Sequence, residues 1–117
     1  MDSEELRNRT KRFAVAIVKM ADDLPNNKAV DVIYRQLLQA ATSVGANYRA
    51  ACKARSKADF VSKITIVEEE ADESAYWLEM LLETGLGKPE HLMPLRKEAI
   101  ELTAIFTASG KTAKKNR

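Results

Sequence analysis

Apolar residues recur at alternating spacings of three and four along four stretches of the chain, and no other feature constrains the fold as strongly. This spacing marks one face of an α-helix, and no strand pattern accompanies it. We therefore predict an all-α fold with helices at about residues 4–23, 28–54, 57–84 and 92–108. The apolar stripes comprise Leu6, Phe13, Ile17, Met20 and Leu24; Val30, Ile33, Leu37, Ala40, Val44, Asn47 or Tyr48, and Ala51; Phe60, Ile64, Val67, Ala71, Leu78 and Leu81; and Leu92, Leu95, Ala99, Leu102 and Phe106.

Turn and cap residues separate the four stretches. Pro25 follows the first stretch, and a residue that precedes proline avoids the helical conformation. Ser56, with Asp59 three residues later, is a variant of the capping box that begins a helix. Gly85 is a typical helix C-cap, and Leu86 would supply the hydrophobic contact that accompanies it. Short turns of this kind make consecutive helices antiparallel neighbours.

The chain of 117 residues is long enough for one domain with a hydrophobic core. We predict an antiparallel up-down four-helix bundle over residues 1–108. The start of the last helix is set so that Pro94 falls in its first turn, where proline is tolerated. Residues 109–117 are small, polar and basic, which predicts a disordered tail. The polar N-terminus and the lack of a membrane-length apolar run predict a cytoplasmic protein.

Charge is strongly segregated along the chain, although the net charge is only +2. Residues 24–63 carry seven basic and two acidic side chains, whereas residues 64–87 carry seven acidic side chains and no basic ones. The basic residues bracket the turn between the second and third helices. They could hold nucleic-acid phosphates, or they could be a solvated helix end that complements its own dipole. The candidate nucleic-acid contacts are Arg49, Lys53, Arg55, Lys57 and Lys63.

The sequence contains no recognisable catalytic, cofactor or metal site. A di-iron site in a helical bundle requires Glu-x-x-His motifs, and no glutamate here has a histidine three residues later. The single histidine, His91, lies beside a predicted loop. Cys52 has no histidine partner and is interpreted as a small packing residue, while Gly85 and Gly87 lack the Lys-Ser/Thr of a phosphate-binding loop. We therefore predict a protein that is not an enzyme and binds no cofactor or metal.

Apolar side chains are also expected on the outside of the bundle. Such residues are common on protein surfaces, but contiguous patches usually mark association, so a subunit interface is the preferred interpretation. The candidate interface residues are Val15, Val18, Val32, Leu38, Ile66, Tyr76, Met93 and Ile100.

Glu70, Glu73 and Trp77 share one face of the predicted third helix. This face is either a polar network or a contact site.

Several segments resemble the signature of one bacterial family, the "four helix bundle protein" group, also called the intervening-sequence proteins of large-subunit ribosomal RNA. These segments are residues 6–11, 37–38, 43–52, 55–60 and 66–79. The motif falls on Gly45, Asn47, Tyr48, Arg49, Arg55, Ser56, Asp59, Phe60, Glu70, Asp72, Glu73 and Trp77. Glu69 departs from the pattern, since many relatives have lysine there.

The resemblance implies a four-helix bundle that assembles into a ring-like homopentamer. It also implies a relationship to the accessory variability protein of diversity-generating retroelements, which binds RNA and a reverse transcriptase. Within the motif, Gly45 would allow a close helix approach, Asn47 on the core stripe would fix register, and Ser56 with Asp59 would cap a helix. These roles are expectations for the structure to test.

Two functional hypotheses follow from the sequence. The first is a non-enzymatic homo-oligomer that binds RNA or DNA through its basic turn. The second is a scaffold whose partner is another protein, docked on the acidic third helix or on the outward apolar residues. The resemblance favours the first hypothesis.

Overall fold

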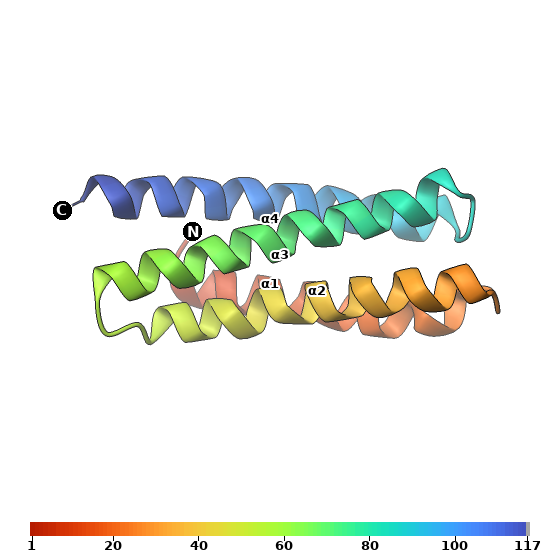
Figure 1. Cartoon of the computed structure of the whole chain (residues 1–117), viewed down its shortest axis with the longest axis horizontal. Helices are drawn as coiled ribbons and strands as arrows, with labels where there is room; N and C mark the ends of the chain where they lie inside the picture. The colour runs from red at the N-terminus through yellow and green to blue at the C-terminus, as the bar shows by residue number, and fades with distance from the viewer. Residues whose placement is uncertain (117) are drawn as a thin grey trace.

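The computed structural model describes residues 1–116 and confirms an all-α, antiparallel up-down four-helix bundle (Figure 1). No strand occurs within these residues. Both termini lie at the end of the bundle that carries the turn between the second and third helices. The helices are α1 (Ser3–Lys19), α2 (Lys28–Cys52), α3 (Lys57–Glu83) and α4 (Pro89–Lys115), and a short 3-10 helix, η1 (Met20–Asp23), directly follows α1.

Side-chain and glycine caps fix most of the helix boundaries. The Asn27 side chain accepts hydrogen bonds from the first turn of α2, and Ser56 Oγ accepts one from Asp59 N at 3.0 Å, as the capping box predicts. Gly85 has a φ of 69°, and the Leu86 N–H donates to the Leu81 carbonyl at 3.0 Å. This is the hydrogen bond of a Schellman cap, so the predicted glycine C-cap of α3 is confirmed.

The N-terminal boundaries of α1 and α4 differ from the sequence prediction. The helix α1 begins at Ser3, one residue earlier than predicted, and Asp2 caps it, because its carboxylate accepts from Glu5 N at 2.8 Å. The helix α4 begins at Pro89, three residues earlier than predicted, since proline suits the first helical position. Pro94 consequently lies inside the helix rather than in its first turn.

The C-terminal segment is helical through Lys115 where the sequence predicted a disordered tail. A Cβ atom at Gly110 would lie 3.7 Å from Ile64 Cγ2, so this part of α4 still packs against the start of α3. Lys114 and Lys115 in the last turn complement the helix dipole. The prediction for residues 109–115 is corrected accordingly, and residue 117 lies outside the described residues.

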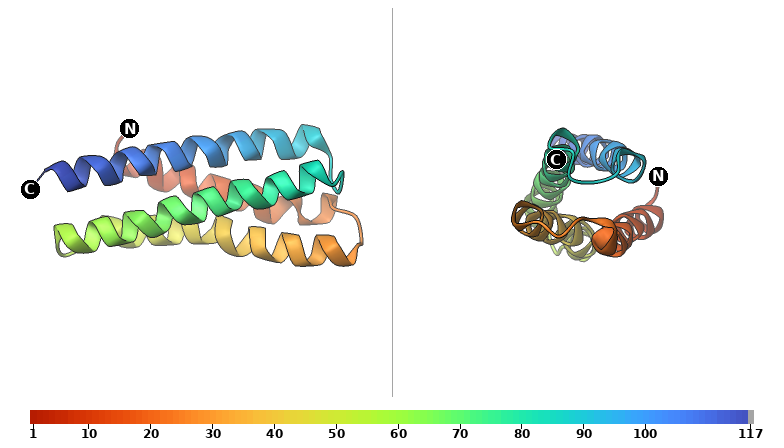
Figure 2. Two further views of the ribbon diagram at one scale, coloured as in Figure 1. Left: turned by 45° about the horizontal axis from the view of Figure 1, so that its top comes forward. Right: turned by 90° about the vertical axis from the view of Figure 1, so that its right-hand side faces the viewer.

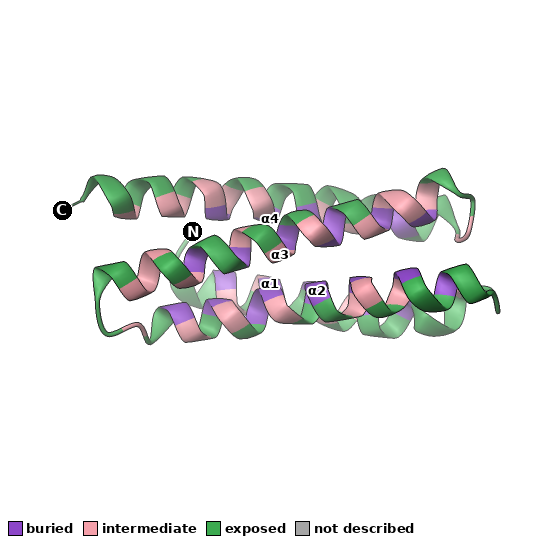
Figure 3. Ribbon diagram, in the orientation of Figure 1, coloured by how far each residue is buried: buried purple, intermediate pink, exposed green. Residues whose placement is uncertain are grey.

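The hydrophobic core runs along the whole bundle (Figure 3), and α3 is its central element. It packs extensively against both α2 and α4, whereas α1 packs mainly on α2 and touches α4 at few points (Figure 2). One of these points is an ion pair in which Arg9 donates to both carboxylate oxygens of Glu98 at 2.6 and 2.7 Å. The side of the bundle between α1 and α4 is therefore its least densely packed side.

The α1 and α2 helices approach closely at a pair of small residues. A Cβ atom at Gly45 would lie 3.3 Å from Thr10 Oγ1 and 3.5 Å from the Thr10 backbone. Thr10 is fully buried, and its hydroxyl donates to the Leu6 carbonyl at 2.8 Å. The close approach expected at Gly45 is therefore present.

Tyr48, and not Asn47, occupies the core position on α2. Its ring lies 5.2 Å from that of Phe106 between centroids, and burial raises the pKa of Tyr48 to about 12. Asn47 is half-buried, and its amide donates to the Ser43 carbonyl of its own helix at 2.8 Å. The proposed role of Asn47 in fixing register from the core is therefore wrong, because its side chain bonds within one helix.

Within residues 1–116, no helix combines the length and the apolar character that a membrane crossing requires.

Candidate nucleic-acid interface

The turn between α2 and α3 presents four exposed basic side chains at one end of the bundle. They are Arg49, Lys53, Arg55 and Lys57, and none forms an ion pair within the described residues. We call them the basic turn. Because they extend from the last turn of α2 to the first residue of α3, their positive charges share one end of the molecule.

Lys63 does not belong to the basic turn, although the sequence grouped it there. Its ammonium pairs with the Asp59 carboxylate at 2.5 Å, one helical turn away on α3. The hydrogen bond from Lys63 lowers the pKa of Asp59. The positive charge of Lys63 is thus already compensated by a carboxylate of its own helix.

The end of α4 brings further positive charge to the same end of the bundle (Figure 1). Lys111, Lys114 and Lys115 are exposed on the last turns of the helix, in the part that packs beside the start of α3. This contribution was not predicted from the sequence, because the small, polar and basic residues at the C-terminus resemble a disordered tail. The i, i+3, i+4 spacing of the three lysines was the available signal.

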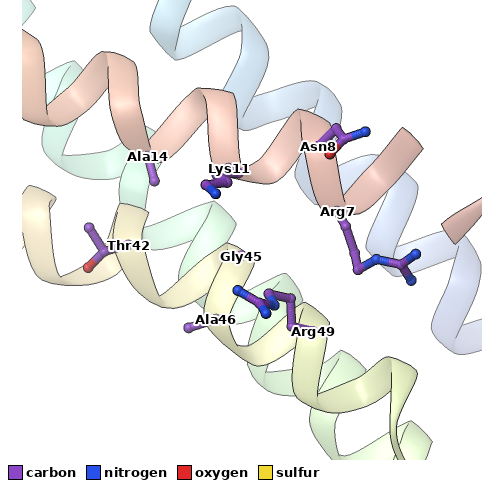
Figure 4. Close-up of a pocket in the computed structure, with 8 residues that line it drawn as sticks. All are labelled: Arg7, Asn8, Lys11, Ala14, Thr42, Gly45, Ala46 and Arg49. Atoms are coloured by element: carbon purple, nitrogen blue, oxygen red, sulfur yellow. The ribbon is translucent and has the colours of Figure 1, made fainter. Parts of the chain in front are cut away.

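A surface groove between α1 and α2 continues from the basic turn (Figure 4). It has a volume of about 400 Å³, and small residues from both helices form part of its lining. Arg7 and Lys11 line it from α1, and Arg49 lines it from α2. Sequence reasoning placed Arg49 in the basic turn but gave Arg7 and Lys11 no role, because only helix packing brings them opposite Arg49.

None of the three cations in this groove has a carboxylate partner within ion-pair distance among residues 1–116. Arg7 donates only to Ser3 Oγ, at 3.3 Å. Arg9, by contrast, points toward α4 and is held by Glu98, whose hydrogen bond and charge raise the pKa of Arg9. The groove is therefore a concentration of uncompensated positive charge.

The outer face of α3 has the opposite charge. Exposed Ile66 and Tyr76 lie there among carboxylates, and no basic residue follows until the end of the helix. Burial, followed by the charge of Glu73, raises the pKa of Glu70. Trp77 Nε1 lies 3.4 Å from a Glu73 oxygen, and its ring meets that of Tyr76 edge-on with centroids 4.9 Å apart. We call the surface formed by Ile66, Glu69, Asp72, Glu73 and Tyr76 the acidic face.

The outer surface of α1 is an apolar patch with basic borders. Val15 and Val18 are 42% and 52% exposed, and Arg12 and Lys19 lie beside them. We call these four residues the basic face. In the end-on view, α1 and α3 occupy diagonal corners of the bundle, so the two faces of opposite charge point in different directions (Figure 2).

Seven of the eight predicted interface residues are exposed, but they do not gather on one side. They lie on all four helices: Val15, Val18, Val32, Ile66, Tyr76, Met93 and Ile100. Leu38 is the exception, since it is half-buried and packs against the core. Its prediction as an outward residue is wrong because the position faces the boundary of the core rather than solvent.

Among residues 1–116, no cluster of three or more His, Cys, Asp and Glu side chains is placed to hold a metal ion. His91 is exposed, with its Nδ1 3.7 Å from an Asp23 carboxylate oxygen. Cys52 is also exposed, so its interpretation as a packing residue is corrected. Phe60 is half-buried and packs against the core at the start of α3.

The sequence over residues 3–108 matches the model of a family described as 23S rRNA-intervening sequence protein. The chain belongs to this family. A solved structure, described as a protein with unknown function from the S23 ribosomal protein family of Bacteroides thetaiotaomicron VPI-5482, is 34% identical. It superimposes with a TM-score of 0.82 over 90% of this chain and 97% of its own. No curated protein matches this intervening-sequence family member.

Proposed function

We propose that this intervening-sequence protein is a non-enzymatic homo-oligomer that associates with RNA through the basic end of its bundle. The observation that carries the proposal is the location of the basic turn and of the last turns of α4, with their lysines, at the same end of the molecule. Such an arrangement attracts the phosphate backbone by releasing its counterions. The family description, which refers to 23S rRNA, supports RNA as the nucleic acid and the cytoplasm as the compartment.

Assembly is the second part of the proposal. The basic face and the acidic face each expose two large apolar side chains, and their charges are complementary. Because the faces lie on diagonal helices, one copy can use both at once in head-to-tail contacts, which close into a ring when the rotation allows it. A homopentamer, as the family resemblance implies, would repeat the basic end five times.

A structured RNA tests the binding site directly. We expect Lys53→Ala, Arg55→Ala and Lys57→Ala together to weaken binding and to reduce the slope of log affinity against log salt by about 2, since each lost phosphate contact contributes about 0.7 for single strands. The matched control removes three exposed basic residues that belong neither to the basic turn nor to the basic face, with Lys28→Ala, Arg35→Ala and Lys88→Ala. Equal slopes for wild type and both variants would contradict the proposal.

The acidic face supports a second candidate function, a scaffold that docks a basic protein. Four carboxylates lie on or beside this face around exposed Ile66 and Tyr76, which is a typical composition for a partner surface. Recovery of a specific partner from nuclease-treated extract, abolished by Glu69→Lys with Glu73→Lys, would favour the scaffold over RNA binding. Loss of recovery on nuclease treatment would favour RNA binding.

A further inference from the structure

We propose that the groove between α1 and α2 is a phosphate-binding track for the backbone of RNA, with Arg7, Lys11 and Arg49 as its ligands (Figure 4). This inference rests on the proposed association with RNA and names a binding site for it. It differs from the basic turn because two of its three cations come from α1, which contributes nothing to that turn.

The first argument is electrostatic. Three cationic side chains converge on one groove, and no carboxylate within ion-pair distance compensates them in the described part of the chain. By contrast, Arg9 on α1 and Lys63 on α3 are both paired with carboxylates. Like charges held together repel one another, so an anionic ligand stabilises this arrangement.

The second argument is the shape of the groove. Gly45 brings α2 against Thr10 of α1, and Ala14 and Ala46 keep the adjoining surface low. Long cationic side chains therefore border a shallow floor without large side chains to fill it. A phosphate group can reach the guanidinium and ammonium groups there, and Asn8 and Thr42 add polar atoms to the lining.

The third argument concerns the length of the array. Arg7 and Lys11 are one helical turn apart on α1, which corresponds to about 6 Å along the helix. Arg49 lies in the last turn of α2, and Lys53 is the residue that caps the end of this helix. The cations thus form two short rows that lead from the groove into the basic turn. A linear polyanion can contact such rows successively, whereas a single small anion uses only one position. This favours an RNA backbone over a free phosphate compound.

The test measures binding of a structured RNA across a range of salt concentrations. We expect Arg7→Ala, Lys11→Ala and Arg49→Ala together to reduce the salt slope by about 2 and to weaken affinity at least tenfold at low salt. The matched control removes the same charge outside the groove, with Lys28→Ala, Arg35→Ala and Lys97→Ala. The control is expected to keep the wild-type slope within about 0.5.

A second variant tests the groove itself without changing any charge. Ala46→Trp places a bulky side chain on an exposed position of the lining, and it should weaken RNA binding while the thermal unfolding temperature stays close to that of the wild type. Inorganic tripolyphosphate separates the two sources of phosphate. Tripolyphosphate should compete with RNA for the wild-type protein and should not bind the variant that lacks Arg7, Lys11 and Arg49.

The outcomes distinguish this inference from the proposed function. A wild-type protein that binds no RNA at low salt contradicts the proposed function itself. If RNA binding depends on the basic turn but is unchanged by both groove variants, the groove is not a binding site and the proposed function stands. Tripolyphosphate binding that requires the groove, without any RNA binding there, also overturns the RNA track.

Discussion

At the scale of single residues, position on the helix determines what each polar side chain can do. Asn47 and Tyr48 are neighbours on α2, but their side chains are rotated by about 100° around the helix axis. Tyr48 is therefore buried in the core, whereas Asn47 lies at its boundary. Lys63 and Lys57 are both basic residues of α3, but only Lys63 has an acid one turn away. The sequence therefore identifies candidate residues, and their neighbours decide which charges remain available.

Glu70 offers a residue-scale prediction for stability. Its raised pKa means that the folded state disfavours the ionised carboxylate, so ionisation lowers stability at neutral pH and ceases to do so as pH falls below the unfolded value of about 4.3. Glu70→Gln should therefore raise the unfolding temperature at pH 7 and leave it unchanged near pH 3. Thermal unfolding followed by circular dichroism measures both, and an equal gain at the two pH values would contradict the assignment.

At the scale of elements, α4 shows how packing extends a helix beyond its obvious sequence pattern. The apolar stripe of α4 ends at Phe106, but Gly110 still contacts Ile64 and the basic last turn favours the helix dipole. Sequence composition alone made residues 109–115 resemble a solvated tail. Their helical order places the last three lysines of α4 at the same end of the bundle as the basic turn.

Substitutions at two glycines test the ends of α3 and α4. Gly85→Ala should destabilise the protein by about 1–2 kcal/mol, because alanine is strained at a φ of 69° although no atom lies within 4 Å of its Cβ. Gly110→Ala should instead stabilise it by about 0.5–1 kcal/mol, because the residue is inside a helix and its Cβ makes an ordinary contact. Urea unfolding gives both values. A neutral or destabilising Gly110→Ala would contradict helical order at the end of α4.

At the scale of the whole molecule, charge is arranged by direction as well as by sequence. The basic turn and the end of α4 lie at the end of the bundle that carries both termini. The basic face and the acidic face lie along helices at diagonal corners of the bundle. Under the proposed function, the basic turn and the lysines of α4 would bind a polyanion, and the basic and acidic faces would bind copies of the same chain. The basic turn shares no residue with the basic face or with the acidic face, so RNA binding and assembly can be altered separately.

Charge reversal tests the proposed head-to-tail assembly. Arg12→Glu with Lys19→Glu on the basic face, or Glu69→Lys with Glu73→Lys on the acidic face, should each lower the mass measured by light scattering. A chain carrying all four changes should regain the wild-type mass. A mixture of the two single-face variants should assemble only with even numbers of copies, because each contact then requires one of each. A monomeric wild type at micromolar concentration, or no rescue by the four changes, would contradict the assembly.

The sequence by itself determined the features that depend on neighbours along the chain. Helical periodicity, the Ser56 and Gly85 caps and the basic turn all arise from residues within a few positions of one another, whose geometry the backbone fixes. Only the tertiary structure decided that Arg7 and Lys11 line one groove with Arg49, and that the last turns of α4 lie at the same end of the bundle as the basic turn. Those relations depend on how closely helices pack, as at Gly45 and Thr10, and that distance is set by contacts between residues far apart in sequence.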